Sequence, residues 1–338
     1  MLDVTDYDEF GLFHENIAEF DLDVAEIPPV VRIETNLGDQ GRSVSALRWG
    51  SDDPEIVYLH GGAQNAHTWD TVALALGRSA VAVDLPGHGH SDWRAEGAYS
   101  PMTLADDVAD VVALHAPRAR VVVGMSLGGL TAMELTVRHP ALVRSLVMVD
   151  ITPGVNAAKT KAITDFVDGP QEFASFDDLL ARTIEHNPTR TESSLRRGIL
   201  HNAHPQPDGS WQWRYDRGSH ARARQTAAET SDTAASDTPA PDAPDALSPL
   251  WDHFGSISCP VALVRGSLSP VVDDDDVAEA RRRQPELTVH VVDGAGPSVQ
   301  GDRPVELAAI LAALLCAPHP DVCVAFRVGR VTRNATQT

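Results

Sequence analysis

The chain has 338 residues, a formal net charge of −21 and 43% hydrophobic residues. This length suits one large domain carrying an inserted subdomain, and the hydrophobic content is enough for a sizeable core. The excess of negative charge disfavours nucleic acids and anionic membrane surfaces as partners. No apolar run approaches the roughly 20 residues that a membrane span needs, so we expect no span.

The three cysteines, Cys259, Cys316 and Cys323, are unevenly spaced. Their spacing indicates neither a disulfide framework nor a zinc site. The N-terminal stretch is acidic and interrupted by charges, which is not the pattern of a secretory signal. We therefore expect a cytoplasmic protein, and the sequence leaves its oligomeric state open.

Short apolar runs alternate with amphipathic segments along the chain, a pattern that predicts βαβ units around a parallel sheet. Several of the apolar runs are continuous and rich in Val, as in strands buried on both faces. We predict an α/β fold with a mostly parallel eight-stranded sheet and helices on both faces. The predicted strands are 31–35, 44–49, 55–60, 80–84, 120–124, 145–150, 261–265 and 287–292, and the predicted helices are 68–76, 103–115, 127–138, 274–283 and 304–315.

The pattern is interrupted between residues 153 and 255, which we predict to form a helical cap subdomain inserted into a core of residues 31–152 and 256–315. Helical signals cover 173–186 and 191–201, and Trp211, Trp213 and Tyr215 form an aromatic cluster. Residues 225–246 contain five acidic residues, three prolines and no large apolar residue, so we predict a disordered loop. Residues 1–30 form an N-terminal extension, and residues 316–338 fit no regular element.

The main chemical signal is Gly124-Met125-Ser126-Leu127-Gly128, a G-x-S-x-G motif. A run of valines precedes it and a helical run follows, which is the strand–turn–helix setting of a nucleophile elbow. The two glycines leave room in the strained turn, which holds the Ser126 hydroxyl above the sheet. The competing interpretation is a glycine-rich turn with an incidental serine.

A second signal, His60-Gly61-Gly62-Ala63, ends the predicted strand 55–60. In this architecture the loop after the third strand gives one N–H of an oxyanion hole, and the residue after the nucleophile gives the other. Those would be the N–H of Gly62, or of Ala63, and the N–H of Leu127. By itself this segment is equally an ordinary strand-ending turn. The tight turn at 84–91 contains His88, which we interpret as structural.

Together these features resemble the α/β-hydrolase superfamily over roughly residues 30–315. The matching segments are HGG at 60–62, DLPGHGHSDW at 84–93, GMSLGG at 124–129, LVMVDITPG at 146–154, CPVALVRGSLSPVV at 259–272 and VVDGAGPSVQGDRP at 291–304. The chain is similar to bacterial hydrolases of the esterase, lipase or C–C hydrolase kind. The resemblance implies Ser–His–acid chemistry, in which serine attack forms an acyl-enzyme that water then hydrolyses.

The family's usual acid position, after the seventh strand, holds Ser269 in this chain. The family also uses an acid at the end of the sixth strand, where this chain has Asp150, and Asp150 is our preferred acid. It reads equally as an N-cap or turn aspartate. The run Asp273 to Asp276 is a second choice, although it reads more simply as the acidic start of a helix.

The family's histidine position after the last strand holds Pro297, which has no proton to transfer. Without a general base, a serine is a poor nucleophile at neutral pH. Each of the other candidate bases also reads as a surface or packed histidine; they are His67, His90, His201, His204 and His220. His290 lies within a predicted strand.

The sequence thus favours a serine hydrolase that acts on a small or medium carboxylic ester or related acyl substrate through Ser126 and the oxyanion loop, with its activity in question because of Pro297. One alternative is a catalytically inactive homologue that serves as a binding protein, and another is a non-hydrolytic lyase on the same fold. No cofactor is implied, and no cluster has metal-ligand spacing. Relatives that cleave epoxides or haloalkanes use an aspartate nucleophile, which disfavours those reactions.

Overall fold

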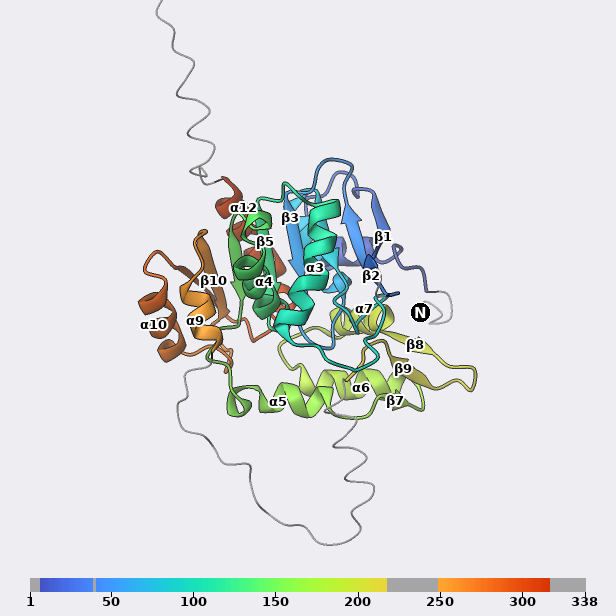
Figure 1. Cartoon of the computed structure of the whole chain (residues 1–338). Helices are drawn as coiled ribbons and strands as arrows, with labels where there is room; N and C mark the ends of the chain where they lie inside the picture. Colours follow the sequence, from blue (N-terminus) through green and yellow to red (C-terminus); the bar gives the residue numbers. More distant parts are fainter. Residues whose placement is uncertain (1–6, 39–40, 218–248, 317–338) are drawn as a thin grey trace, which may run out of the picture.

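The structure is a computed structural model that describes residues 7–38, 41–217 and 249–316 (Figure 1). The predicted loop 225–246, nearly all of the tail 316–338, His220 and Cys323 lie outside these residues. No helix in the described ranges combines the length and the apolar character that crossing a membrane requires.

The main sheet has eight strands in the order β1-β2-β4-β3-β5-β6-β10-β11. The pairs β1–β2 and β2–β4 are antiparallel, and the other neighbours are parallel, so the predicted mostly parallel eight-stranded sheet is confirmed. The strands are β1 (Val30–Asn36), β2 (Ser43–Trp49), β3 (Ile56–Leu59), β4 (Ala80–Val83), β5 (Val121–Met125), β6 (Leu146–Val149), β10 (Val261–Gly266) and β11 (Thr288–Val292).

Helices cover both faces of this sheet because its central strands are apolar on both sides. In β3, Val57 and Leu59 face one core while Ile56 and Tyr58 face the other. The first core is closed by α3 (Pro101–His115), α4 (Leu127–Arg138), α9 (Leu250–Gly255) and α10 (Asp274–Arg283). The second is closed by α1 (Phe13–Glu19), α2 (Asp70–Leu76), α11 (Val299–Asp302) and α12 (Pro304–Cys316).

Residues 151–217, which follow β6 and are called the insertion below, have a small core of their own. The sequence predicted only helices for it, but it also contains a three-stranded antiparallel sheet in the order β7-β9-β8. The aromatic cluster lies in and after β9, where Trp211 and Trp213 are buried against α6 and α7. Its elements are α5 (Ala157–Val167), β7 (Glu172–Phe173), α6 (Phe176–His186), α7 (Glu192–Asn202), β8 (Ala203–Pro205) and β9 (Trp211–Trp213).

The insertion is joined to the loop that follows β3 by buried hydrogen bonds. The Asn202 amide donates to the Ala63 carbonyl at 2.7 Å, and the Asn65 amide donates to the His201 carbonyl at 2.9 Å. In the sequence we predicted one helix over 68–76; the structure has a 3-10 helix η2 (Ala66–Trp69) followed by α2. The insertion therefore lies over the carboxyl end of β3.

Candidate active site

Ser126 occupies the turn between β5 and α4, as the G-x-S-x-G motif predicts. Its backbone has φ 50° and ψ −121°, a left-handed region that non-glycine residues rarely adopt. A Cβ at Gly124 would lie 2.2 Å from the Gly128 carbonyl oxygen, and one at Gly128 would lie 2.3 Å from the Leu59 carbonyl oxygen. Both positions therefore need glycine for the turn to close.

Gly62 and Leu127, the two candidate oxyanion residues, belong to segments that meet at this turn. A Cβ at Gly62 would lie 4.0 Å from the Leu127 side chain, so the loop after β3 passes next to the start of α4. Leu127 is the first residue of α4, and its N–H is among those that a helix leaves without an internal acceptor. Ala63 has φ 59°, which turns the chain sharply after Gly62.

Asp150 lies at the carboxyl end of β6, next to the elbow, since the Ser126 N–H donates to the Val149 carbonyl. Its backbone is also left-handed, with φ 51°. The buried carboxyl accepts hydrogen bonds from the Ser269 hydroxyl at 2.5 Å and from the Gly266 N–H at 3.1 Å. Burial raises the pKa of Asp150 to about 7, although these two hydrogen bonds act in the opposite direction. The serine at the family's usual acid position thus partners the acid that we preferred.

The second-choice acids belong to a helix start. Asp273 and Asp276 form a capping box at the beginning of α10. Both also pair with Lys159, at 2.8 and 2.6 Å. These carboxylates therefore already have partners that stabilise α10 and its contact with α5.

Pro297 lies in a loop that contacts the residues around Asp150. The Leu268 N–H donates to the Ala295 carbonyl at 2.9 Å, and a Cβ at Gly266 would lie 2.3 Å from the Gly296 carbonyl oxygen. The loop after β11 therefore packs on the carboxyl end of β10, where the Gly266 N–H donates to Asp150. Position 297 carries a half-buried proline, so this loop contributes no titratable group there.

In the described part of the chain no side chain hydrogen-bonds the Ser126 hydroxyl. His60 donates to the Gly61 carbonyl at 2.7 Å and accepts from the Leu85 N–H at 2.9 Å, and burial lowers its pKa to about 3. His88 contacts the Pro86 carbonyl within the 84–91 turn, as predicted for a structural histidine.

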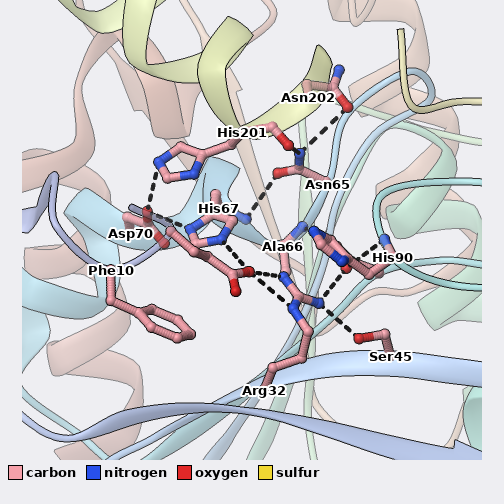
Figure 2. A network of polar contacts seen from close by, with 12 residues as sticks. Phe10, Arg32, Ser45, Asn65, Ala66, His67, Asp70, His90, His201 and Asn202 are labelled. Carbon is pink, nitrogen blue, oxygen red and sulfur yellow. Dashed lines mark hydrogen bonds and ion pairs between the residues drawn. The ribbon is translucent and has the colours of Figure 1, made fainter. Parts of the chain in front are cut away.

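His67 and His201 belong to a buried polar network that ties three parts of the chain together (Figure 2). His67 follows the β3 loop and contacts Asp70 at 2.8 Å and Glu9 at 3.1 Å. The Tyr7 hydroxyl donates to His201 Nδ1 at 2.7 Å. The network connects the N-terminal extension, the β3 loop and the insertion. Sequence reasoning missed Tyr7 and Glu9 because nothing in residues 1–30 distinguishes them from a solvated acidic extension.

The two histidine rings carry different charges. Burial lowers the pKa of His67, but Asp70 and Glu9 outweigh it and raise that pKa to about 9. Burial and the neighbouring His67 cation hold the pKa of His201 well below its ordinary value. At neutral pH a protonated His67 donates to both carboxylates, while a neutral His201 accepts from Tyr7.

His67, Asp70 and His201 have metal-ligating side chains whose ligand atoms lie within 4.8 Å of one another. However, the two rings are stacked with centroids 3.8 Å apart and planes 8° apart. A metal ion lies in the plane of each imidazole at roughly 2.0–2.1 Å from the nitrogen. An ion midway between these two parallel rings would lie out of both ring planes by nearly the length of a metal–nitrogen bond, instead of within them. The arrangement therefore fits the hydrogen bond between His67 and Asp70 better than it fits a metal ion.

A cavity of about 140 Å³ lies between the β3 loop, the insertion and α11. Ala63, next to Gly62, lines it, but Ser126 does not. Its polar lining includes Asn65, Thr68, His67, Asp70, Arg190, Ser194 and Gln300. The cavity thus begins beside the candidate oxyanion loop and ends at the insertion.

The fold and the elbow place this chain among the α/β hydrolases. The model of the family described as alpha/beta hydrolase fold matches residues 54–304, and the chain belongs to this family. The esterase Rv0045c of Mycobacterium tuberculosis is 41% identical over 320 residues, which cover 93% of this chain and 97% of the esterase.

Two solved structures are similar to the whole fold. A structure of the same esterase, from work on its transition metal inhibition, has a TM-score of 0.76 and covers 92% of this chain and 99% of that one. The structure of E-2-(acetamidomethylene)succinate hydrolase is 25% identical, has a TM-score of 0.70 and covers 86% of this chain and 100% of that one.

Proposed function

We propose that this chain is a carboxylic ester hydrolase whose turnover is limited by Pro297. The observation that carries the proposal is the left-handed backbone at Ser126, held by two glycines that admit no Cβ. Such strain persists only where the surrounding structure maintains it, and it clusters at functional sites. The 41% identity to an esterase over nearly the whole chain supports ester hydrolysis as the reaction class.

In the proposed reaction the Ser126 hydroxyl oxygen attacks the ester carbonyl carbon. The N–H groups of Gly62 and Leu127 donate to the oxyanion that forms, and collapse of this intermediate expels the alcohol. Water then hydrolyses the acyl-enzyme and regenerates the serine. The insertion acts as a cap that closes the site over a small ester substrate.

The missing step is the removal of the serine proton. In a complete triad the histidine takes this proton and the acid stabilises the resulting imidazolium. Here position 297 has no base, and the carboxyl of Asp150 is bonded to Ser269 instead. Loss of the base in such enzymes lowers kcat by roughly 10⁴–10⁶, which leaves the contributions of the oxyanion hole and of binding.

Hydrolysis of short p-nitrophenyl esters by the native chain, Ser126→Ala and Pro297→His tests this proposal. We expect slow native turnover that Ser126→Ala removes, and a gain of about 10²-fold or more in Pro297→His as a base returns. Native turnover that depends on Ser126 and does not change in Pro297→His would mean that another group supplies the base.

A binding protein without catalysis is the second candidate, and Pro297 is the observation that favours it. It predicts no difference in ester hydrolysis between the native chain and Ser126→Ala, together with saturable binding of the ester to both. Pro297→His would still gain activity under this candidate, so the native–Ser126→Ala comparison separates the two.

A further inference from the structure

Arg190 is a half-buried cation in the wall of the cavity, and within the described residues no carboxylate accepts a hydrogen bond from it. It lies just before α7, and its Nη2 donates to the Ser194 hydroxyl at 2.6 Å. Its Nε atom is buried and has no hydrogen-bond partner. Of the five N–H donors of a guanidinium, Ser194 therefore uses one. Burial lowers the pKa of Arg190, and the nearby Asp302 and Glu19 act in the opposite direction without outweighing it.

The two carboxylates that act on Arg190 electrostatically, Asp302 and Glu19, are hydrogen-bonded to other groups. Asp302 accepts from the Thr189 hydroxyl at 3.1 Å and from the Gly296 N–H at 2.7 Å. Glu19 accepts from Arg197 and from Thr191. Within the described residues no carboxylate lies within ion-pair distance of Arg190. Asp302 and Glu19 act on Arg190 from beyond ion-pair distance and leave its remaining N–H groups without a protein acceptor among the described residues, which points to an anion that binds there.

Arg190 lines the cavity beside the candidate oxyanion loop, together with Gln300. The Gln300 side-chain oxygen is likewise buried without a partner, while its nitrogen donates to the hydroxyls of Thr68 and Ser298. Because those hydroxyls can also donate, Gln300 can turn and present its N–H₂ group to the cavity. Arg190 and Gln300 then offer several donors to one anion.

The cavity lies next to position 297 as well. Gln300 and Gly301, which line the cavity, lie in the first turn after Pro297 and Ser298, and a Cβ at Gly301 would lie 2.9 Å from the Arg190 Nε atom. The guanidinium therefore rests on the first turn after the loop that carries Pro297. Asp70, which lines the same cavity, accepts a hydrogen bond from the protonated His67 at 2.8 Å, so it does not cancel the charge of Arg190.

We propose that Arg190 and Gln300 bind the carboxylate of the substrate, and that the substrate is a monoester of a short dicarboxylic acid. The planar guanidinium can donate two parallel hydrogen bonds to a carboxylate. A volume of about 140 Å³ suits a chain of a few carbons and is well below the roughly 300–1,000 Å³ of pockets for drug-sized ligands. The choice of an ester rests on the proposed function, whereas the carboxylate site does not.

Binding of glutarate to the full chain, measured by titration calorimetry and by the shift in Tm, tests the site without any turnover. We expect saturable binding to the native chain, weaker by at least 10-fold in Arg190→Gln, and weak or absent binding of the neutral analogue glutaramide. Arg118→Gln is the matched control, because Arg118 is exposed and pairs with Asp53 at the surface. Its glutarate affinity should equal that of the native chain.

Gly301→Ala gives a second test that keeps the charge. Its Cβ would push the guanidinium away from α11, so glutarate should bind more weakly although Arg190 is intact. Arg190→Lys provides a folded cationic variant if Arg190→Gln lowers the yield of folded protein. It should bind more weakly than the native chain, since an ammonium lacks the planar pair of donors.

Failure of the native chain to bind glutarate, equal binding of glutaramide, or stronger binding of inorganic phosphate than of glutarate would each overturn the carboxylate site. The ester part is tested separately, with mono-p-nitrophenyl glutarate and p-nitrophenyl butyrate in the Pro297→His background. A preference for the acidic ester that Arg190→Gln removes supports the proposal. Glutarate binding without hydrolysis of either ester would sink the proposed function and leave the carboxylate site standing.

Discussion

Asp150→Asn should make the protein more stable at pH 8, although it removes a residue of the candidate site. The carboxyl is buried, its hydrogen-bond donors Ser269 and Gly266 are neutral, and the nearby Arg265 and Asp302 act on it in opposite directions. A carboxylate in such surroundings keeps its proton to a higher pH than in the unfolded chain. Asparagine has nearly the same shape and tolerates the left-handed backbone at this position, so the substitution removes the titration with little other change.

The size of the effect follows from the pKa shift, from an ordinary value of 3.8 for an aspartate to about 7 in the folded chain. Because the folded pKa is the higher one, the contribution of this group is fully present below about pH 3.8. It is lost as the pH rises through about 7, where the folded carboxyl ionises. At roughly 1.36 kcal/mol for each pKa unit, the native chain loses about 4 kcal/mol of unfolding free energy from this one group.

Urea unfolding of the native chain and of Asp150→Asn at pH 4.5, 6, 7 and 8 measures this difference. The unfolding free energy of Asp150→Asn minus that of the native chain should increase by about 3 kcal/mol or more from pH 4.5 to pH 8. A difference between the two proteins that stays constant with pH would refute the argument. In Pro297→His the new imidazolium should lower the Asp150 pKa, so the pH-dependent gain from Asp150→Asn should shrink.

Three further predictions concern the elbow and the buried network. The folded chain raises the pKa of His67 to about 9, so the native chain should lose unfolding free energy as the pH rises from 7 to 9. His67→Gln removes this titration, and its unfolding free energy in urea should change less over the same pH range. Gly128→Ala should destabilise the fold by about 3 kcal/mol or more, because its Cβ would meet a backbone oxygen. A Cβ at Gly62 meets no close atom, so Gly62→Ala should have the same Tm as the native chain in a circular dichroism melt. Tyr7→Phe should lower the unfolding free energy by about 1–2 kcal/mol in urea, as His201 Nδ1 loses its donor.

The sequence predicted the sheet and the strained turn at Ser126 because both depend on local order in the chain. Continuous valine runs identify strands that are buried on both faces, and each run maps onto a strand of the sheet. The elbow is a contiguous motif whose two glycines are required by the backbone of the same turn and of the adjoining strand. Its left-handed serine follows directly from that spacing.

The insertion was predicted less well because its sheet pairs short strands that carry little signal of their own. β7, β8 and β9 have two or three residues each, so no alternation of polar and apolar residues is visible in them. Pairing Phe173 with Trp211 depends on the packing of α6 and α7 beneath them. The helices α6 and α7 were predicted because their apolar periodicity extends over several turns, whereas α5 was not predicted.

The sequence by itself determined the fold class, the place of Ser126 in the turn after β5 and the presence of proline at position 297, since each depends on residues that are neighbours in the chain. Only the tertiary structure decided which charges meet. It brought Ser269 to Asp150, Tyr7 and Glu9 to the two stacked histidines, and left Arg190 in a cavity with no carboxylate partner among the described residues. The reason is physical: a pKa or a binding site depends on burial and on neighbours within a few ångströms, and those neighbours are separated by 58 to 194 residues in the contacts that join the network.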